Sequence, residues 1–277
     1  MKRIAYLVLA ALLMSLAAIA CSGSGGGGGV VNISGDQLVG NVSVALDKIS
    51  TFRLSIDAKE NFSGVLDGEK GSAAIHLAAT GAQDNENQKM QMEMNISGIA
   101  TGAGSLNAQI KEYLIGDTAY MWTDMPDSPK GWTRYDIPTY MWDTQNYPKK
   151  LADIIYNAEI KILKIQKVGG VNCYVVEIHP DVDAVLDMMG SMYGSDMMGL
   201  TEDILSDYNC TGWYAQDTFY PMKFYVECNL NMEEGADKLT GKVTMTEELY
   251  DYNKPVTVQL PSAARDAEYG GSLDIGG

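Results

Sequence analysis

Alternating apolar and polar residues predict that most of this chain forms β-strands. Every second residue is apolar in three long stretches, 52–58, 90–96 and 222–232. A period of two places successive side chains on opposite faces of a sheet. Strands with one apolar and one solvated face are typical of antiparallel sheets. The pattern therefore predicts a mainly β, antiparallel protein.

Short polar or glycine-containing segments separate the apolar runs. Gly116-Asp117 and Gly169-Gly170 each lie between two runs of strand-forming residues. Such dipeptides favour the two-residue turns of β-hairpins. Asp217-Thr218 links the run 213–215 to the strand that begins at Met222. We therefore expect a meander of consecutive hairpins.

Three segments show helical spacing instead. Residues 35–49 form an amphipathic pattern with Ser34 or Asp36 as a possible cap. Residues 148–157 begin with proline, which suits a first helical turn. A third helical region is predicted at 180–193, with a possible extension over 201–206. Because a sheet with one apolar face needs a cover, we expect an α+β protein in which helices lie across the concave side of a strongly curved sheet.

The N-terminal segment has the features of a secretory signal. Met1-Lys2-Arg3 is basic, and an uncharged run rich in leucine and alanine leads to Cys21. The end of this run resembles the lipobox of prokaryotic lipoproteins, in which the cysteine is acylated. Ala18-x-Ala20 would also suit ordinary signal peptidase and release a soluble protein. A transmembrane helix needs about 20 apolar residues, and this run is shorter.

The remaining chain divides into a linker, one domain and a tail. Residues 21–34 hold the acylated cysteine and a glycine-rich tether, which would let a folded body float near a bilayer. We expect one domain over 35–262 and a flexible tail over 263–277. The predicted location is the extracytoplasmic face of a prokaryotic cell membrane, where the protein is held by its lipid anchor.

The charge restricts the partners. The formal net charge is −16, and removal of 1–20 takes two basic residues and no acid, which gives −18. A body this acidic repels nucleic acid and anionic lipid surfaces. We therefore expect no nucleic-acid partner, contact with the membrane only through the anchor or an apolar surface, and a monomer.

The chain contains three segments, 113–122 with Gly131-Trp132, 168–181 and 252–261, that resemble the LolA–LolB–LppX superfamily of lipoprotein and lipid carriers. The segment 113–122, followed by Gly131-Trp132, is similar to the central hairpin of that family. The segments 168–181 and 252–261 are similar to a later hairpin and to its closing segment. The resemblance covers about Asp36 to Pro261. It implies a half-barrel with an apolar cavity that holds lipid or lipoprotein acyl chains.

Methionines and other apolar residues on the predicted inner face are candidates to line a ligand cavity. Methionine adapts to apolar guests of variable shape, and a methionine-rich stretch near 188–198 suggests either a lid or flexible core filler. The candidate cavity residues are Leu54, Ile56, Met92, Met94, Met121, Met188, Met189, Met192, Met222 and Phe224.

Three cysteines follow the anchor. If Tyr214 pairs with Phe224 around the turn at Asp217, Cys210 lies opposite Cys228. An extracytoplasmic location permits a disulfide between them. Cys173 would then be a free thiol, and a bond from Cys173 to either partner stays an alternative.

The chain offers few of the side chains that catalysis, metal binding or cofactor binding requires. Only His76 and His179 are present, far apart in sequence, and no Gly-x-Ser-x-Gly elbow occurs. Acids near 181–207 do not have the spacing of a calcium-binding EF-hand loop. We therefore predict no enzyme, no metal and no cofactor.

Two functions are consistent with these features. The first is an anchored lipoprotein that binds a hydrophobic ligand between sheet and helices, with a possible role in lipid or lipoprotein transfer. The second is a surface interaction or sensory module whose cavity is filled by side chains. In that case a partner would contact aromatic residues, which are Trp122, Trp132, Tyr140, Trp142 and Trp213.

Overall fold

The structure is a computed structural model of the 277-residue chain. It describes residues 32–66, 68–102, 104–126, 128–138, 142, 146–181, 205–234 and 237–272. The statements below refer to these residues.

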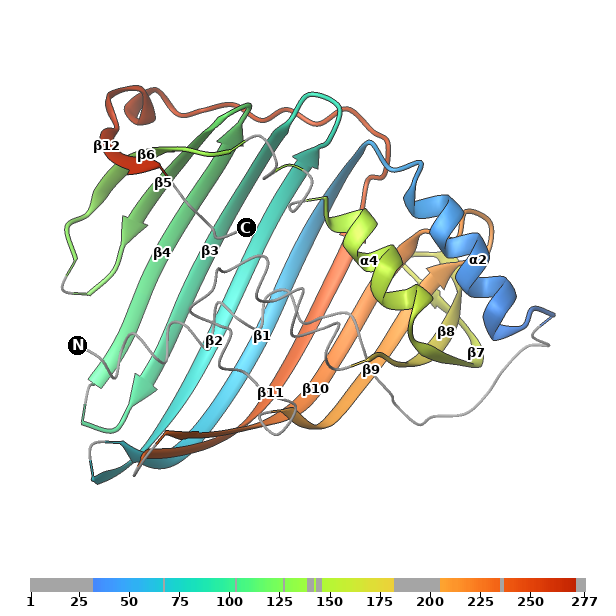
Figure 1. Ribbon diagram of the computed structural model, residues 1–277, viewed down its shortest axis with the longest axis horizontal. Coiled ribbons are helices and arrows are strands. Elements are labelled where there is room, and N and C mark those ends of the chain that lie inside the picture. The colour runs from blue at the N-terminus through green and yellow to red at the C-terminus, as the bar shows by residue number, and fades with distance from the viewer. Residues whose placement is uncertain are drawn as a thin grey trace.

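Twelve strands form one open sheet (Figure 1). Their order across the sheet is β12-β6-β5-β4-β3-β2-β1-β11-β10-β9-β8-β7. The strands are β1 (Thr51–Leu66), β2 (Glu69–Asp84), β3 (Lys89–Ala100), β4 (Gly104–Ile115), β5 (Thr118–Asp124), β6 (Gly131–Asp136), β7 (Glu159–Val168), β8 (Val171–His179), β9 (Leu205–Ala215), β10 (Pro221–Glu234), β11 (Asp237–Tyr250) and β12 (Glu268–Ser272).

Neighbouring strands are antiparallel with one exception. β1 joins the two halves of the meander, because it pairs with β2 on one side and with the distant β11 on the other. β12 pairs with β6 in parallel. The sheet is therefore mixed, which corrects the prediction of a purely antiparallel sheet. The parallel pair arises because the chain returns to the far edge after β11, where β6 offers free backbone groups.

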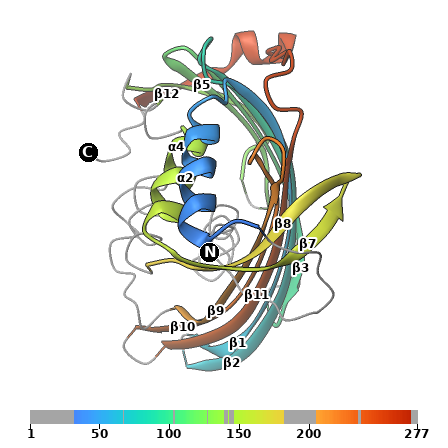
Figure 2. The same cartoon turned by 90° about the vertical axis from the view of Figure 1, so that its right-hand side faces the viewer.

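Two α-helices lie together on one side of the sheet, α2 (Gly35–Leu46) and α4 (Tyr147–Tyr156). In Figure 2 the strands curve and both helices lie on the inner side of the curve. Figure 1 places them over the end of the sheet that carries β7 to β11. We call the side of the sheet that faces these helices the inner face, and the opposite side the outer face.

The helices begin where the sequence indicates. Ser34 caps α2 with a reciprocal pair of hydrogen bonds, in which Gln37 N–H donates to Ser34 Oγ at 3.2 Å and Ser34 N–H donates to Gln37 Oε1 at 3.0 Å. Asn146 caps α4, and Pro148 lies in its first turn. Both helices present apolar residues to the core, including Leu38, Val42, Leu151 and Ile155.

The predicted alternation and turns are confirmed. The apolar residues of 52–58 are buried, as are Phe224 to Leu230 at every second position. Ile115 pairs with Thr118 across Gly116-Asp117, and Val168 pairs with Val171 across Gly169-Gly170.

Two expectations about chain segments differ from the structure. The predicted tail 263–277 overlaps a 3-10 helix η3 (Ser262–Asp266) and strand β12, so it is ordered up to Ser272 where the structure describes it. Here Tyr269 donates a hydrogen bond to Asp136 at 2.7 Å. The possible helical extension over 201–206 is wrong at its end, because Leu205 and Ser206 belong to β9. Pro180 and Asp181 are not helical, and the rest of the predicted region, 182–193 and 201–204, lies outside the described residues.

Candidate functional site

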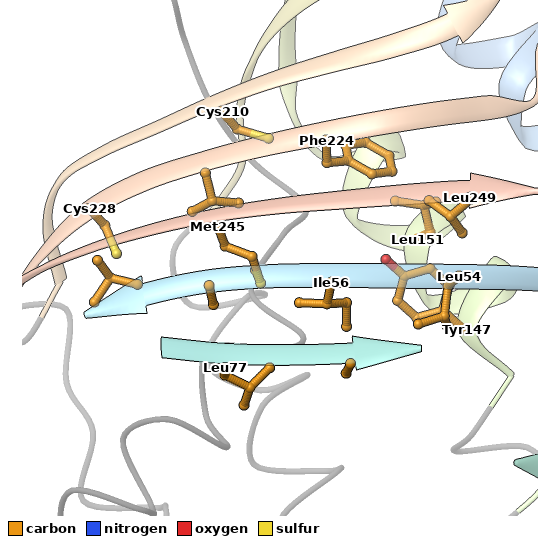
Figure 3. Close-up of a cluster of buried hydrophobic side chains, with 14 of the residues drawn as sticks. Leu54, Ile56, Leu77, Tyr147, Leu151, Cys210, Phe224, Cys228, Met245 and Leu249 are labelled. Carbon is orange, nitrogen blue, oxygen red and sulfur yellow. The ribbon is translucent and has the colours of Figure 1, made fainter. Parts of the chain in front are cut away.

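The inner face carries one continuous apolar surface. Figure 3 shows side chains from five neighbouring strands and from α4 on this face, among them Ile56, Leu77, Phe224 and Met245. All four are buried, with exposed fractions of 4% or less. Because strand residues alternate between faces, this surface takes every second residue of each strand.

The structure brings most of the described candidate cavity residues together. Leu54, Ile56, Met94 and Phe224 belong to the buried core of the inner face. Met92 and Met121 are partly buried and pack against that core. Met222 is partly buried beside the register shift between Pro221 and Lys223. Met188, Met189 and Met192 lie outside the described residues.

Three glutamates occupy positions on this face where the pattern calls for an apolar residue. The buried series Phe52 to Ala58 continues through Glu60 to Phe62 on β1. On β11, Glu247 lies between buried Met245 and Leu249, and on β4 Glu112 lies between Ile110 and Leu114. Sequence reasoning missed these three acids, although extending the period of two along each strand would have found them. We call Glu60, Glu112 and Glu247 the inner-face acids.

Glu247 is buried with a hydrogen-bond partner. Its exposed fraction is 1%, and Tyr147 of α4 donates its hydroxyl to Glu247 Oε2 at 2.5 Å. Burial raises the pKa of Glu247 to about 7, while this hydrogen bond lowers it. The pKa of the Tyr147 phenol is also raised, to well above 10, by burial and by the nearby Glu247 carboxylate. Tyr252 lies near the pair and donates its hydroxyl to the carbonyl oxygen of Pro221.

Tyr214 completes the group of aromatic residues around Glu247. Its ring packs edge-on against Phe224, with ring centroids 5.9 Å apart. Gly212 leaves room for this ring, because a Cβ at Gly212 would lie 2.7 Å from Tyr214 Cε2. The Tyr214 hydroxyl is buried and has no hydrogen-bond partner. Burial also raises its pKa well above 10.

Glu60 is buried without any partner. Its exposed fraction is 1%, and neither carboxyl oxygen has a hydrogen-bond partner among the residues that the structure describes. In register it lies between Ile75 of β2 and Val243 of β11, and Cys228 of β10 pairs with Val243 in the same row. Burial raises the pKa of Glu60 to about 8. The carboxyl group is therefore mostly protonated at neutral pH, on a wall of apolar side chains.

Glu112 extends the acidic character of the face toward β4. It is partly buried and pairs in register with Met92 and Met121. Burial raises its pKa. The buried polar or charged residues of the described chain are Glu60, Gln83, Asp84, Thr211 and Glu247, so no lysine or arginine is among them. An arrangement of this kind can donate hydrogen bonds as neutral acids, or hold a cation as carboxylates.

The cysteines do not form the predicted pair. Cys173, Cys210 and Cys228 are all buried, and none of them forms a disulfide within the described residues. Val226, not Cys228, pairs with Cys210, because Tyr214 pairs with Pro221 and not with Phe224. The connection is shorter than the assumed pairing of Tyr214 with Phe224 implies, and a register shift between Pro221 and Lys223 then leaves Val226 opposite Cys210.

The raised pKa values of two of these thiols are typical of buried core cysteines. Burial, followed by the negative charges of Glu60 and Glu227, raises the pKa of Cys228 to about 12. Burial also raises the pKa of Cys173. Both groups are therefore protonated at neutral pH, and thiolate nucleophiles need the opposite environment.

An open hollow of about 540 Å³ lies at the flank of α2. It is lined by Asn32, Ile33, Gln37, Gly40, Asn41 and Tyr174. None of the candidate cavity residues lines this hollow, and its walls are largely polar amides. It is therefore a different place from the predicted ligand site.

The histidines lie on the opposite side of the sheet from the inner-face acids. His76 Nε2 is 2.7 Å from Asp57 Oδ2, and His179 Nε2 is 3.2 Å from Glu177 Oε1. Both side chains are more than 40% exposed. In the described part of the chain, no three His, Cys, Asp or Glu residues come together as metal ligands would.

The predictions on N-terminal processing and anchoring concern residues that the structure does not describe. Cys21 and the predicted signal 1–20 lie outside the described residues, as does most of the predicted tether. Among the helices that are described, none is both long and apolar enough to cross a membrane.

Comparisons with known proteins give no family. No protein-family model matches the chain. No curated protein matches it by sequence.

Solved structures with distant similarity include three bacterial proteins. A DUF1329 family protein from Desulfovibrio piger is 10% identical, with a TM-score of 0.26, over 81% of this chain and 93% of the other. The MucA/MucB complex of Pseudomonas aeruginosa gives 12% identity and a TM-score of 0.28 over 83% of this chain and 61% of the other. A β-barrel-like DUF1849 protein from Brucella abortus gives 9% identity and a TM-score of 0.22, over 73% and 99%.

Proposed function

We propose that this protein is an extracytoplasmic lipoprotein that binds a hydrophobic ligand against the inner face of its sheet. In this proposal the curved sheet is a half-barrel, α2 and α4 cover one end of its concave face, and the ligand lies between sheet and helices. The arrangement is that of the LolA–LolB–LppX carriers, which the sequence resembles. Transfer of lipid or of lipoprotein acyl chains is one use of such a site.

The unpartnered carboxyl group of Glu60 is the observation that carries this proposal. Buried polar groups in proteins nearly always have a hydrogen-bond partner. Leaving one without a partner costs about 1–3 kcal/mol of stability, and more when the group is charged. Glu60 gives the fold no hydrogen bond in return, since both its oxygens are unpaired. A polar group held at such a cost is typical of a binding site.

The apolar surroundings of Glu60 define the rest of the ligand. Around its row lie buried aliphatic and aromatic side chains from several strands, such as Phe62, Leu77 and Leu230. A ligand that contacts this wall gains about 25 cal/mol for each Å² of apolar surface removed from water. The ligand therefore has a long apolar part.

A first experiment tests for the ligand itself. The mature protein, purified without detergent, is extracted with organic solvent and the extract is examined by mass spectrometry. A neutral hydrophobic fluorophore, N-phenyl-1-naphthylamine, is titrated into the extracted and refolded protein in parallel. We expect a copurified amphiphile, or saturable binding of the fluorophore with enhanced emission. Absence of both results would refute a ligand-binding function.

Anchoring at Cys21 has its own test. We propose that the protein is held at the extracytoplasmic face of the membrane by acyl chains on this cysteine. Two chains give stable attachment, because each buried methylene contributes about 0.8 kcal/mol. Cys21→Ser should move the protein from the membrane fraction to the medium, or leave it uncleaved. Equal solubility of wild type and variant after cleavage at Ala20 would contradict the anchor.

An interaction module with a filled interior is the second candidate. The observation that favours it is the close packing of the candidate cavity residues, since Leu54, Ile56 and Phe224 are all at most 7% exposed. Trp122, Trp132 and Trp213 are only partly buried, which is compatible with a protein partner at these residues. Lys111 and Lys130 both lie over the ring of Trp122, at 5.6 and 5.1 Å from its centroid. Failure of both ligand tests would favour this candidate.

We propose a binding role and not a catalytic one. Both histidines lie on the outer face, where they contact Asp57 and Glu177, so neither is close to the inner-face acids. The thiols of Cys173 and Cys228 have raised pKa values and are therefore protonated at neutral pH. These features support a site that recognises a molecule without changing it.

A further inference from the structure

We propose that Glu60 binds the ammonium group of a hydrophobic amine, so that the ligand of the inner face is a cationic amphiphile and not a fatty acid. This inference rests on the proposed function, because it names the chemical class of the ligand. Three observations support it. They are the position of Glu60, the other charges on the inner face, and the lack of a described hydrogen-bond donor to either carboxyl oxygen of Glu60.

The two carboxyl oxygens of Glu60 need donors. Both are buried and have no partner in the described part of the chain, and an ionised carboxylate accepts hydrogen bonds at both oxygens. A primary ammonium group carries three N–H donors and one positive charge. One such group can therefore supply a donor to each oxygen and neutralise the charge. A neutral alcohol supplies a single donor and no charge.

The groups that face Glu60 add no competing cation. Its neighbours in register are Ile75 of β2 and Val243 of β11, which are aliphatic. Cys228 of β10 follows in the same row, and its thiol is neutral because its pKa is raised. Within the described chain, nothing on these strands at this level provides an internal ammonium or guanidinium partner.

The remaining inner-face acids select against anionic ligands. Glu247 lies four residues beyond Val243 on β11, roughly 13 Å along the strand. Glu112 lies on the same face three strands away from β1, on β4. A fatty acid would bring a fourth carboxyl group to a surface that has no buried basic residue to pair with it. A phospholipid phosphate meets the same obstacle. Like charges at such sites disfavour the ionised form.

The experiment compares three probes with the same twelve-carbon chain and different head groups. Dodecylamine, dodecanol and dodecanoate are titrated calorimetrically into the mature wild-type protein, below their micelle concentrations. About 0.15 M salt screens charges more than about 8 Å apart, so that the acidic surface contributes little. We expect dodecylamine to bind at least about tenfold tighter than dodecanol, because its hydrogen bonds are charge-assisted. Dodecanoate should bind weakest.

Two variants separate Glu60 from the overall negative charge. Glu60→Gln keeps the size of the side chain and removes its acid, and should reduce the preference for dodecylamine to less than about threefold. Glu248→Gln is the matched control, since it removes the same charge from an exposed residue that pairs with Lys223 on the outer face. The control should keep the wild-type preference.

A second measurement does not depend on any variant. Glu60 is protonated at pH 6.5, because its pKa is about 8. Pairing with an ammonium group ionises it, so dodecylamine should release close to one proton per molecule bound. Calorimetry in two buffers of different ionisation enthalpy measures this number. Dodecanol should release none. The other groups of this face that titrate, Glu247 and Glu112, are not in the row of Glu60.

Each outcome decides between the claims. Binding of all three probes with similar affinity would overturn the amine proposal and leave the hydrophobic site intact. An amine preference that survives in Glu60→Gln, or that falls equally in Glu248→Gln, would assign it to bulk charge and overturn the role of Glu60. Binding of none of the probes would overturn the proposed function itself.

Discussion

Two adjacent glutamates of β11 have different burial and different partners, because one lies on the inner face of the sheet and the other on the outer face. Glu247 points to the inner face, is 1% exposed and has Tyr147 as its hydrogen-bond partner. Glu248 points to the outer face, where its side chain is 51% exposed and lies 3.5 Å from Lys223 Nζ. Burial raises the pKa of Glu247 to about 7.

The partners on the two faces explain the difference. Outer-face acids meet lysines from neighbouring strands, such as Lys242 at 2.8 Å from Glu227 and Lys111 at 3.0 Å from Glu93. Inner-face acids meet aliphatic groups and phenols. On the outer face the hydrogen bond from Lys242 lowers the pKa of Glu227, whereas burial raises the pKa of the inner-face acids. Glu60 is the extreme case, because it has neither a lysine nor a phenol.

The largest expected effect is a charge placed on the inner face. Leu77 is fully buried on β2, so Leu77→Lys puts an unpaired ammonium group in an apolar core. We expect a loss of about 5 kcal/mol or failure to fold. Ala74→Lys changes an exposed residue of the same strand and should stay within about 0.5 kcal/mol of wild type. Thermal unfolding of both variants checks the contrast, and equal losses would contradict the assignment of faces.

The next effect is a fall in stability as pH rises. An acid whose pKa is raised on folding holds its proton more tightly in the folded state. Between pH 4.5, the ordinary pKa of a glutamate, and about pH 8, the pKa of Glu60 in the folded protein, the unfolded protein therefore binds fewer protons than the folded one. Stability should fall across this window by up to about 4 kcal/mol for Glu60 alone. Glu247 adds to the same fall up to about pH 7.

Glu60→Gln isolates this contribution. We expect the variant to be no less stable than wild type at pH 8, and its stability to depend less on pH between 5 and 8. Urea unfolding at pH 5, 6.5 and 8 measures both. A slope against pH that is unchanged in the variant would show that Glu60 is ionised or solvated in the folded protein.

The third effect concerns the partner of Glu247. Tyr147→Phe removes the hydroxyl and leaves the buried carboxyl group without its donor, which should cost about 1–3 kcal/mol. Tyr225→Phe is the matched change on the outer face, where the hydroxyl donates to Glu227 at 3.1 Å. Water can replace that donor, so we expect less than about 0.5 kcal/mol. Similar losses for the two variants would remove the distinction between the faces.

The smallest effect belongs to an outer-face ion pair. Lys242 lies 2.8 Å from Glu227, and its side chain is 54% exposed. Lys242→Met should change stability by at most about 1 kcal/mol, because exposed pairs are screened by water and salt. Its effect should vanish in about 1 M salt. A larger, salt-independent loss would mean that the outer face is more buried than the structure describes.

The sequence predicted the strands and helices well, because each depends on local pattern. The apolar series from Phe52 to Ala58 and the turn at Gly116-Asp117 need only the period of two and a favoured dipeptide. Ser34 was identifiable as a cap for the same reason. The parallel pairing of β12 with β6 was not predictable, because it depends on where the chain returns after more than 130 residues.

The candidate site was predicted only as an apolar surface. Leu54, Ile56, Met94 and Phe224 were chosen because they alternate with polar residues, and they do lie on one buried face. The inner-face acids were missed because a glutamate in a strand is ordinarily assigned to the wet face. The disulfide prediction failed because the assumed pairing of Tyr214 with Phe224 was wrong: the strands pair closer to the turn, with a register shift after Pro221, and no local pattern reveals that register.

The protonation state of Glu60 tests the account most directly. With 13C-labelled glutamate, the side-chain carboxyl signal of Glu60, assigned by its loss in Glu60→Gln, can be followed at pH 6.5 during titration with dodecylamine. We predict a protonated carboxyl group in the free protein and a carboxylate in the complex. A carboxylate signal in the free protein, or a signal that does not respond to the amine, would contradict the account.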